Sequence, residues 1–190
     1  MTTISEIASL GDIAAGYDAI LCDVWGVVHD GKSAFPAAVA ALARFRAERG
    51  PVLLLSNAPR PGESVIEMLD HLNVPRDAYD GILTSGDATR AEMARRGAAS
   101  FYHLGPPRDR VVWTGLPAVE TKLDAASVLL CTGLADDERE GPDDYKELLA
   151  AARARDLPMI CANPVIKVHR GARLIWCAGA VAAAYEAIGG

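Results

Sequence analysis

The stretch of sequence richest in reactive groups runs from Asp23 to Ser33 (DVWGVVHDGKS) and follows a short apolar run. Asp23 ends that run. If the run is a strand of a parallel sheet, the carboxylate of Asp23 lies where such sheets bind ligands, outside the carboxyl ends of their strands. There it can act as a nucleophile. The same stretch satisfies the phosphate-loop pattern G-x-x-x-x-G-K-[ST] at Gly26, Gly31, Lys32 and Ser33. One segment therefore indicates two different kinds of phosphate chemistry.

The phosphate-loop interpretation needs a helix that begins directly after the second glycine, so that its first amides and the lysine close on the phosphates. Pro36 would fall in the second turn of that helix. There it lacks the N–H group that the helix requires and clashes with the preceding turn, at a cost of about 3 kcal/mol. Asp30 would also place negative charge where phosphate should bind. A nucleotide-binding loop is the weaker of the two interpretations.

Several motifs along the chain resemble those of the haloacid dehalogenase (HAD) superfamily of hydrolases. Asp23 resembles the first aspartate of the family's D-x-D-G-[TV] motif, and Ser56 resembles the Ser or Thr that ends the family's second strand. The nitrophenyl-phosphatase-like branch, which carries a large α/β cap between the second and third motifs, has further signatures. They are matched by His29-Asp30, Pro36, Asn57, Arg60, Thr84-Ser85 and Ala162-Asn163-Pro164. The resemblance covers essentially the whole chain.

This resemblance implies a Mg²⁺-dependent phosphatase that acts on a small phosphorylated metabolite through an aspartyl-phosphate intermediate. Asp23 would be the nucleophile. Its carboxylate and the backbone carbonyl of Trp25 would hold Mg²⁺, which offsets the repulsion between the attacking carboxylate and the phosphate. The residues that would bind the phosphoryl group are Ser56, Asn57, Gly26 and Arg60.

Two departures from the family predict an impaired or incomplete enzyme. The second aspartate of D-x-D-G, a general acid and base in the phosphatases, is Trp25 here. An indole N–H can donate a hydrogen bond but cannot act as an acid or a base near neutral pH. Loss of general acid–base help typically costs 10²- to 10⁴-fold in rate, unless Asp30 or His29 substitutes. The family's third and fourth motifs, a lysine and a strand-terminal acid pair, also find no match before Gly190. A non-catalytic phosphate- or ligand-binding relative is therefore the alternative.

The elements expected around these motifs alternate between strand and helix, which is typical of an α/β fold with a parallel sheet. Strands are predicted at residues 17–24, 51–55 and 81–83, and helices at 37–49, 62–72 and 85–96. A second α/β unit follows, with apolar runs at 100–104, 110–114, 127–132, 159–162 and 173–177 and helices at 142–155 and up to about 188. We expect residues 1–84 to form part of a Rossmann-like HAD core and residues 85–190 to form the inserted α/β cap domain.

Composition excludes several other classes of protein. The 190 residues are 51% hydrophobic and 23% charged, which suits a globular chain, and the net charge of −6 argues against nucleic acid as a partner. No apolar run approaches the roughly 18 residues of a membrane span, and residues 1–10 do not resemble a secretion signal, so a cytoplasmic protein is expected. The four cysteines form no C-x-x-C pair and are expected to be free. On the family topology the sheet would expose an apolar edge, which self-association could cover.

Overall fold

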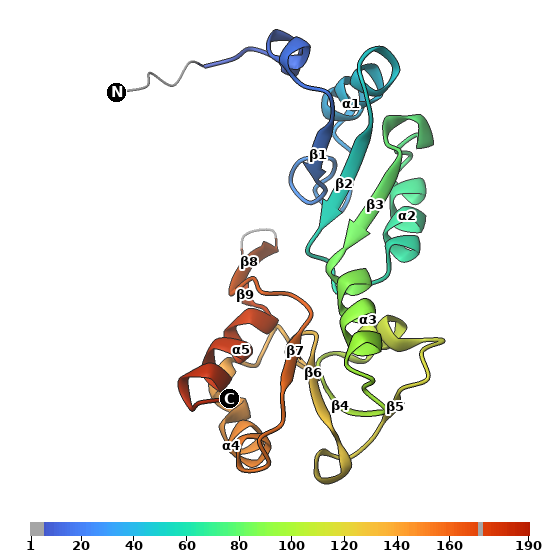
Figure 1. The fold of residues 1–190 in the computed structure, drawn as a ribbon. Coiled ribbons are helices and arrows are strands. Elements are labelled where there is room, and N and C mark those ends of the chain that lie inside the picture. The colour runs from blue at the N-terminus through green and yellow to red at the C-terminus, as the bar shows by residue number, and fades with distance from the viewer. Residues whose placement is uncertain (1–5, 171–172) are drawn as a thin grey trace. The chain divides into compact units, whose positions relative to one another are not determined.

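The computed structural model describes residues 6–170 and 173–190. Contacts between residues divide the chain into two compact units, which are described separately below. The first unit comprises Met1–Ser56 and Gly62–Leu83, and the second comprises Asn57–Pro61 and Thr84–Gly190. Each unit combines helices with parallel strands (Figure 1), so the predicted α/β class with parallel sheets is confirmed.

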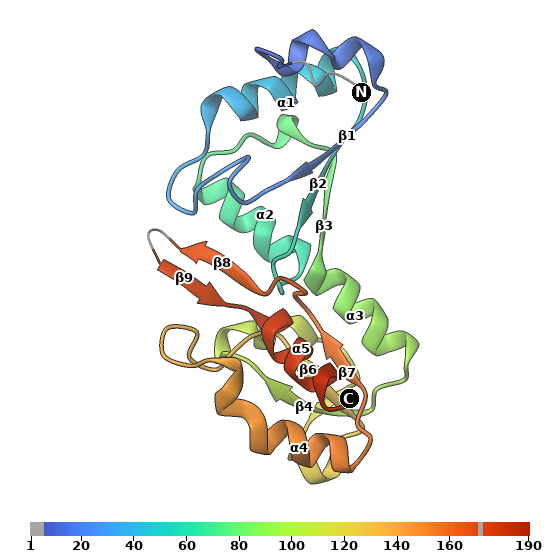
Figure 2. The ribbon, with the colours of Figure 1, turned by 90° about the vertical axis from the view of Figure 1, so that its left-hand side faces the viewer.

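The first unit is a three-stranded sheet in the order β1-β2-β3. Its strands are β1 (Ile20–Asp23), β2 (Val52–Ser56) and β3 (Gly81–Thr84). Helix α1 (Pro36–Glu48) connects the first two strands and α2 (Gly62–His71) the next two. Both helices lie on the same side of the sheet (Figure 2), because successive right-handed crossovers that proceed in one direction cover one face. Short 3-10 helices form at Leu10–Asp12, Ala14–Gly16 and Arg76–Ala78.

The covered face of this sheet forms the core of the first unit. Cys22 and Leu54 are buried there with helix residues such as Leu42 and Leu69. Side chains alternate between the faces of a strand, so the neighbour of Cys22, Leu21, points to the other side and is 69% exposed. The face of the sheet opposite the two helices therefore exposes the apolar side chain of Leu21.

The second unit contains a four-stranded parallel sheet in the order β5-β4-β6-β7 and an antiparallel hairpin. The parallel strands are β4 (Ser100–Leu104), β5 (Val119–Glu120), β6 (Val128–Cys131) and β7 (Met159–Cys161), and the hairpin strands are β8 (Lys167–Arg170) and β9 (Arg173–Trp176). The helices are α3 (Ser85–Arg95), α4 (Lys146–Ala154) and α5 (Ala178–Ala187). Further 3-10 helices occupy Pro107–Trp113, Leu123–Ala125 and Pro142–Tyr145.

Two apolar clusters pack against this sheet. One contains Leu129 of β6 together with residues of α4 and α5, among them Leu149 and Tyr185. The other contains Leu130, the next residue of β6, together with Met93 of α3. Because neighbouring residues of β6 enter different clusters, the strand is buried on both faces, as a continuous apolar run in a parallel strand predicts.

The expected elements differ from the observed ones mainly in the second unit. Residues 110–114, expected as an apolar run, lie largely in the 3-10 helix Pro107–Trp113, which begins at the second of two successive prolines. Strands β5 and β8 were not predicted, because the first has two residues and the second is mostly polar. Both exist through pairing with a neighbouring strand, which no local pattern encodes.

Candidate active site

The pairing of β1 with β2 determines where the predicted nucleophile lies. The two strands are parallel, and Asp23 lies opposite Leu55, so Ser56 extends one residue further along the same edge of the sheet. Side chains alternate along a strand, which places Asp23 on the face of Leu21 and Ser56 on the face of Leu54. Asp23 is exposed, and its Oδ1 accepts a hydrogen bond of 2.7 Å from the N–H of Val24. The carboxylate therefore stands at the carboxyl end of its strand, where the sequence predicted it.

The loop that follows β1 is coiled on itself and anchored in the core. The carbonyl of Val24 accepts hydrogen bonds from the N–H groups of Val28 and His29, at 2.9 and 3.3 Å. Gly26 adopts a φ of +77°, a conformation that favours glycine, and its N–H donates to the carbonyl of His29 at 2.8 Å. Val24, Val28 and His29 are all buried. The backbone beside Asp23 is thus held by packing and by its own hydrogen bonds.

His29 has a structural role in this loop. Its side chain is buried, with 1% of the residue exposed, and its Nδ1 accepts a 2.8 Å hydrogen bond from the N–H of Gly31. Burial lowers the pKa of His29, which keeps the imidazole neutral with its proton on Nε2. A buried ring with this bond cannot take over proton transfer to a ligand in solvent.

Asp30 also has a structural role in the loop. Its Oδ1 accepts hydrogen bonds of 2.8 Å from the N–H groups of both Lys32 and Ser33. The bonds from the backbone of Ser33 and of Lys32 lower the pKa of Asp30 and keep it ionised. These amides are therefore occupied, and α1 begins only at Pro36 rather than after Gly31. The nucleotide-binding interpretation of this segment is wrong, because it needs both free amides and an immediate helix.

Trp25, two residues after Asp23 in the chain, presents a partly exposed aromatic ring. The residue is 48% exposed, and the edge of its ring meets the buried ring of His29, with centroids 5.4 Å apart and an interplanar angle of 80°. Gly31, at a φ of +89°, lies so close that an added Cβ would be 2.6 Å from Cη2 of Trp25. The indole is therefore packed on one side and accessible on the other.

The remaining expected phosphate ligands belong to the second unit, although they directly follow Ser56. Asn57 is exposed. The carbonyl of Arg60 accepts a 2.6 Å hydrogen bond from the hydroxyl of Thr84, and Gly86 donates its N–H to Ala58 at 3.1 Å. Segment 57–61 is thus fastened to the start of α3. Asp23, Trp25, Gly26 and Ser56 belong to the first unit.

Sequence reasoning missed a buried polar cluster in the second unit. Asp109 is 3% exposed, and its Oδ1 lies 3.9 Å from Nε of Arg60, so the guanidinium of Arg60 has an acidic partner. Burial raises the pKa of Asp109, against the opposing effect of a hydrogen bond with Thr132. Thr132 also contacts Nε2 of His103 at 2.9 Å, and burial lowers the pKa of His103 to about 4. The available signal was Asp109 itself, an acid directly before the run at residues 110–114.

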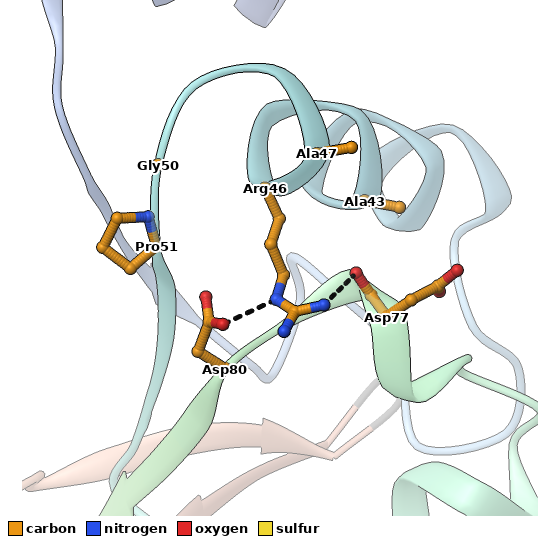
Figure 3. A pocket seen from close by; sticks show the side chains of 7 residues that line it. All are labelled: Ala43, Arg46, Ala47, Gly50, Pro51, Asp77 and Asp80. Carbon is orange, nitrogen blue, oxygen red and sulfur yellow. Dashed lines mark hydrogen bonds and ion pairs between the residues drawn. The ribbon is translucent and has the colours of Figure 1, made fainter.

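A hollow of about 530 Å³ in the first unit lies away from these residues (Figure 3). At its wall Nε of Arg46 binds Oδ1 of Asp80 at 2.7 Å, and the carbonyl of Asp77 accepts a second bond from Arg46. Oδ2 of Asp80 accepts the N–H of Val52, which begins β2, whereas the candidate site lies where β2 ends. The hollow is therefore not part of the candidate site.

The donors beside Asp23 suit a hard cation. Mg²⁺ binds oxygen ligands and is commonly held by one or two carboxylates together with waters and phosphate oxygens. The carboxylate of Asp23 and the carbonyl of Trp25 are oxygen donors two residues apart in one fixed loop. Within the described part of the chain, no group of three or more His, Cys, Asp or Glu residues could hold a metal ion by itself. The residues present therefore fit a cation completed by water and substrate.

Comparison with known proteins agrees with this geometry. The family model of the haloacid dehalogenase-like hydrolases matches residues 20–126, a range that contains β1, its loop and β2. The chain belongs to this family. The match confirms the resemblance inferred from the spaced motifs. No curated protein sequence matches the chain.

Solved structures extend the comparison. The chain is 49% identical to a haloacid dehalogenase-like hydrolase from Brucella suis 1330, with a TM-score of 0.89 over 95% of this chain and 69% of that one. It is 19% identical to a 4-nitrophenylphosphatase from Thermotoga maritima, with a TM-score of 0.72 over 92% of this chain and 66% of that one. A glycerol phosphate phosphatase from Mycobacterium tuberculosis in complex with magnesium is 21% identical, with a TM-score of 0.66 over 92% of this chain and 53% of that one.

The two phosphatases, at such low identity, show a shared fold only. The chain spans between 53 and 69% of the length of these three chains. In residues 6–170 and 173–190 it forms no helix that is long and apolar enough to cross a membrane.

Proposed function

We propose that this hydrolase is a Mg²⁺-dependent phosphatase that acts on a small phosphorylated metabolite through an aspartyl phosphate on Asp23. The observation that carries the proposal is the placement of Asp23. It is an exposed carboxylate at the carboxyl end of a parallel strand, at the same edge of the sheet where the next strand ends at Ser56, and the loop that follows it is fixed by buried anchors.

The chemistry follows from the charges. A carboxylate that attacks a phosphate dianion needs positive charge and hydrogen-bond donors around the phosphoryl oxygens. Mg²⁺, held by the Asp23 carboxylate and the Trp25 carbonyl, would neutralise part of the charge when it is bound. The hydroxyl of Ser56 and the amide of Asn57 are the proposed donors to the phosphoryl group. Gly26 leaves its side of the loop without a side chain, so the phosphate can approach the backbone.

Turnover through this site is expected to be slow. His29 is buried and Asp30 is bound to two backbone amides, so neither of these loop residues can replace the family's general acid at position 25. The expected penalty is about 10²- to 10⁴-fold in rate. Trp25 therefore also favours a second candidate function, in which the protein binds a phosphate compound without consuming it.

Steady-state hydrolysis of 4-nitrophenyl phosphate with Mg²⁺ tests the proposal. Hydrolysis should occur, should disappear in Asp23→Asn and should persist in the matched control Asp18→Asn, which alters an exposed aspartate before β1. Acid quenching with ³²P-labelled substrate should trap label on the wild type and not on Asp23→Asn. Activity that survives Asp23→Asn would refute the assignment of the nucleophile. Thermal stabilisation by phosphate without any hydrolysis would establish the binding function instead.

A further inference from the structure

The residue at position 25 decides how the leaving group departs. In the proposed reaction the bond between phosphorus and the leaving oxygen breaks while that oxygen takes the electron pair. An acidic side chain at this position would donate a proton to the oxygen, and an indole cannot. The loop residues His29 and Asp30 are held away from this task by burial and by hydrogen bonds to backbone amides. With neither of these residues as the acid, the leaving group would depart as an anion.

Trp25 also offers a surface for that leaving group. The ring of His29 supports one edge of the indole, and Gly31 packs against its six-membered ring, so the side chain is held in place. Nearly half of the residue remains exposed, two positions along the chain from the carboxylate of Asp23. A rigid exposed aromatic ring binds planar groups by stacking, at little entropic cost.

We propose that Trp25 makes this hydrolase selective for phosphate esters of planar, acidic hydroxyl groups, namely phenols and enols, which stack on the indole and leave as anions. This inference rests on the proposed function. In the first step an oxygen of Asp23 forms a bond to phosphorus, the ester bond breaks, and the phenolate or enolate later takes a proton from water. In the second step water attacks phosphorus, Asp23 leaves as a carboxylate, and the remaining proton passes to solvent with inorganic phosphate as the product.

The second step also lacks a general base in the loop, so we expect the phosphorylated enzyme to accumulate. With 4-nitrophenyl phosphate the first turnover should appear as a burst of nitrophenolate, followed by a slower steady rate. The amplitude of the burst should approach the concentration of enzyme and should vanish in Asp23→Asn.

A series of substituted phenyl phosphates, with glycerol phosphate as the alkyl comparison, tests the selectivity. In the wild type the burst rate should fall several-fold for each unit by which the pKa of the leaving hydroxyl rises, and glycerol phosphate should give no burst. Trp25→Asp should restore proton donation and raise the rate for glycerol phosphate, relative to phenyl phosphate, by about 10²- to 10⁴-fold. Lys32→Ala should leave the dependence on leaving-group pKa unchanged, since a steeper dependence would identify Lys32 as the acid and overturn the proposal.

The stacking role has its own measurement. Trp25→Leu should raise KM for phenyl phosphates about 3- to 10-fold, whereas Trp25→Phe should stay near the wild-type value. Trp25→Leu and Trp25→Phe test stacking on the indole even if Trp25→Asp does not fold. The melting temperature of each variant shows whether it is folded. Equal rates for alkyl and aryl esters, or an unchanged KM in Trp25→Leu, would overturn this inference while Asp23-dependent hydrolysis still supports the phosphatase. Hydrolysis that survives Asp23→Asn, or a wild type that consumes no ester, would overturn both.

Discussion

Replacement of Gly31 by alanine tests whether the loop holds Trp25 in the way described. Gly31 has a φ of +89°, and a Cβ there would lie 2.6 Å from Cη2 of Trp25, well inside van der Waals contact. Two penalties therefore combine in Gly31→Ala. The positive φ costs about 1–2 kcal/mol for a residue with a Cβ. The overlap with a packed ring costs about 1–3 kcal/mol.

Gly26 provides the matched control in the same loop. It also has a positive φ, of +77°, but an added Cβ there meets nothing within 4 Å. Gly26→Ala should therefore show only the backbone penalty. The difference between the two variants, about 1–3 kcal/mol, corresponds to roughly 2–12 °C in melting temperature for a chain of this size.

Urea unfolding followed by circular dichroism measures these free energies, and a double-mutant cycle assigns the difference to Trp25. In a Trp25→Leu background the excess cost of Gly31→Ala should fall below about 0.5 kcal/mol, because the overlapping ring is gone. If Gly26→Ala and Gly31→Ala destabilise equally, or if the Trp25→Leu background leaves the excess unchanged, the described packing of the indole is wrong.

Three further predictions concern single side chains. Burial lowers the pKa of His103 from 6.5 to about 4, so its protonation should reduce the free energy of unfolding as the pH falls through that window. Between pH 7 and pH 4 the wild type should lose on the order of 2–3 kcal/mol more than His103→Gln, and urea unfolding at the two pH values measures this difference. Tyr185→Phe should lower the free energy of unfolding by about 1–3 kcal/mol, because the buried hydroxyl donates a 2.7 Å hydrogen bond to the carbonyl of Leu157. An unchanged melting temperature would refute this role. Nucleotides should not raise the melting temperature of the wild type or of Lys32→Ala, and a stabilisation by ATP that needs Lys32 would revive the phosphate-loop interpretation.

Much of the architecture could be predicted, because most strands and helices have a characteristic pattern of apolar residues in their own segment of the sequence. Buried parallel strands produce short continuous apolar runs, and β4 was predicted with its observed bounds, residues 100–104. Helix α2 differs from its predicted range by one residue at its end, since its amphipathic pattern repeats over several turns. The two-residue strand β5 and the polar strand β8 carry no such pattern and were missed.

The candidate site was predictable only in part. Its location followed from the sequence, because a parallel pair brings Asp23 and Ser56 to one edge of the sheet. The roles of the loop residues did not follow, since His29 and Asp30 look equally reactive in the sequence. Burial and the backbone amides that each side chain accepts make one a core residue and the other a turn residue.

The sequence by itself determined most of the order of strands and helices, the family and the position of the proposed nucleophile, because these depend on periodicity and on short motifs along the chain. Only the tertiary structure decided which groups remain available for chemistry. A hydrogen bond or a buried environment depends on neighbours that folding supplies, such as Asp109 beside Arg60 and Gly31 beneath the ring of Trp25. That is why the same residue types could be read as a phosphate loop in the sequence and yet form a turn in the structure.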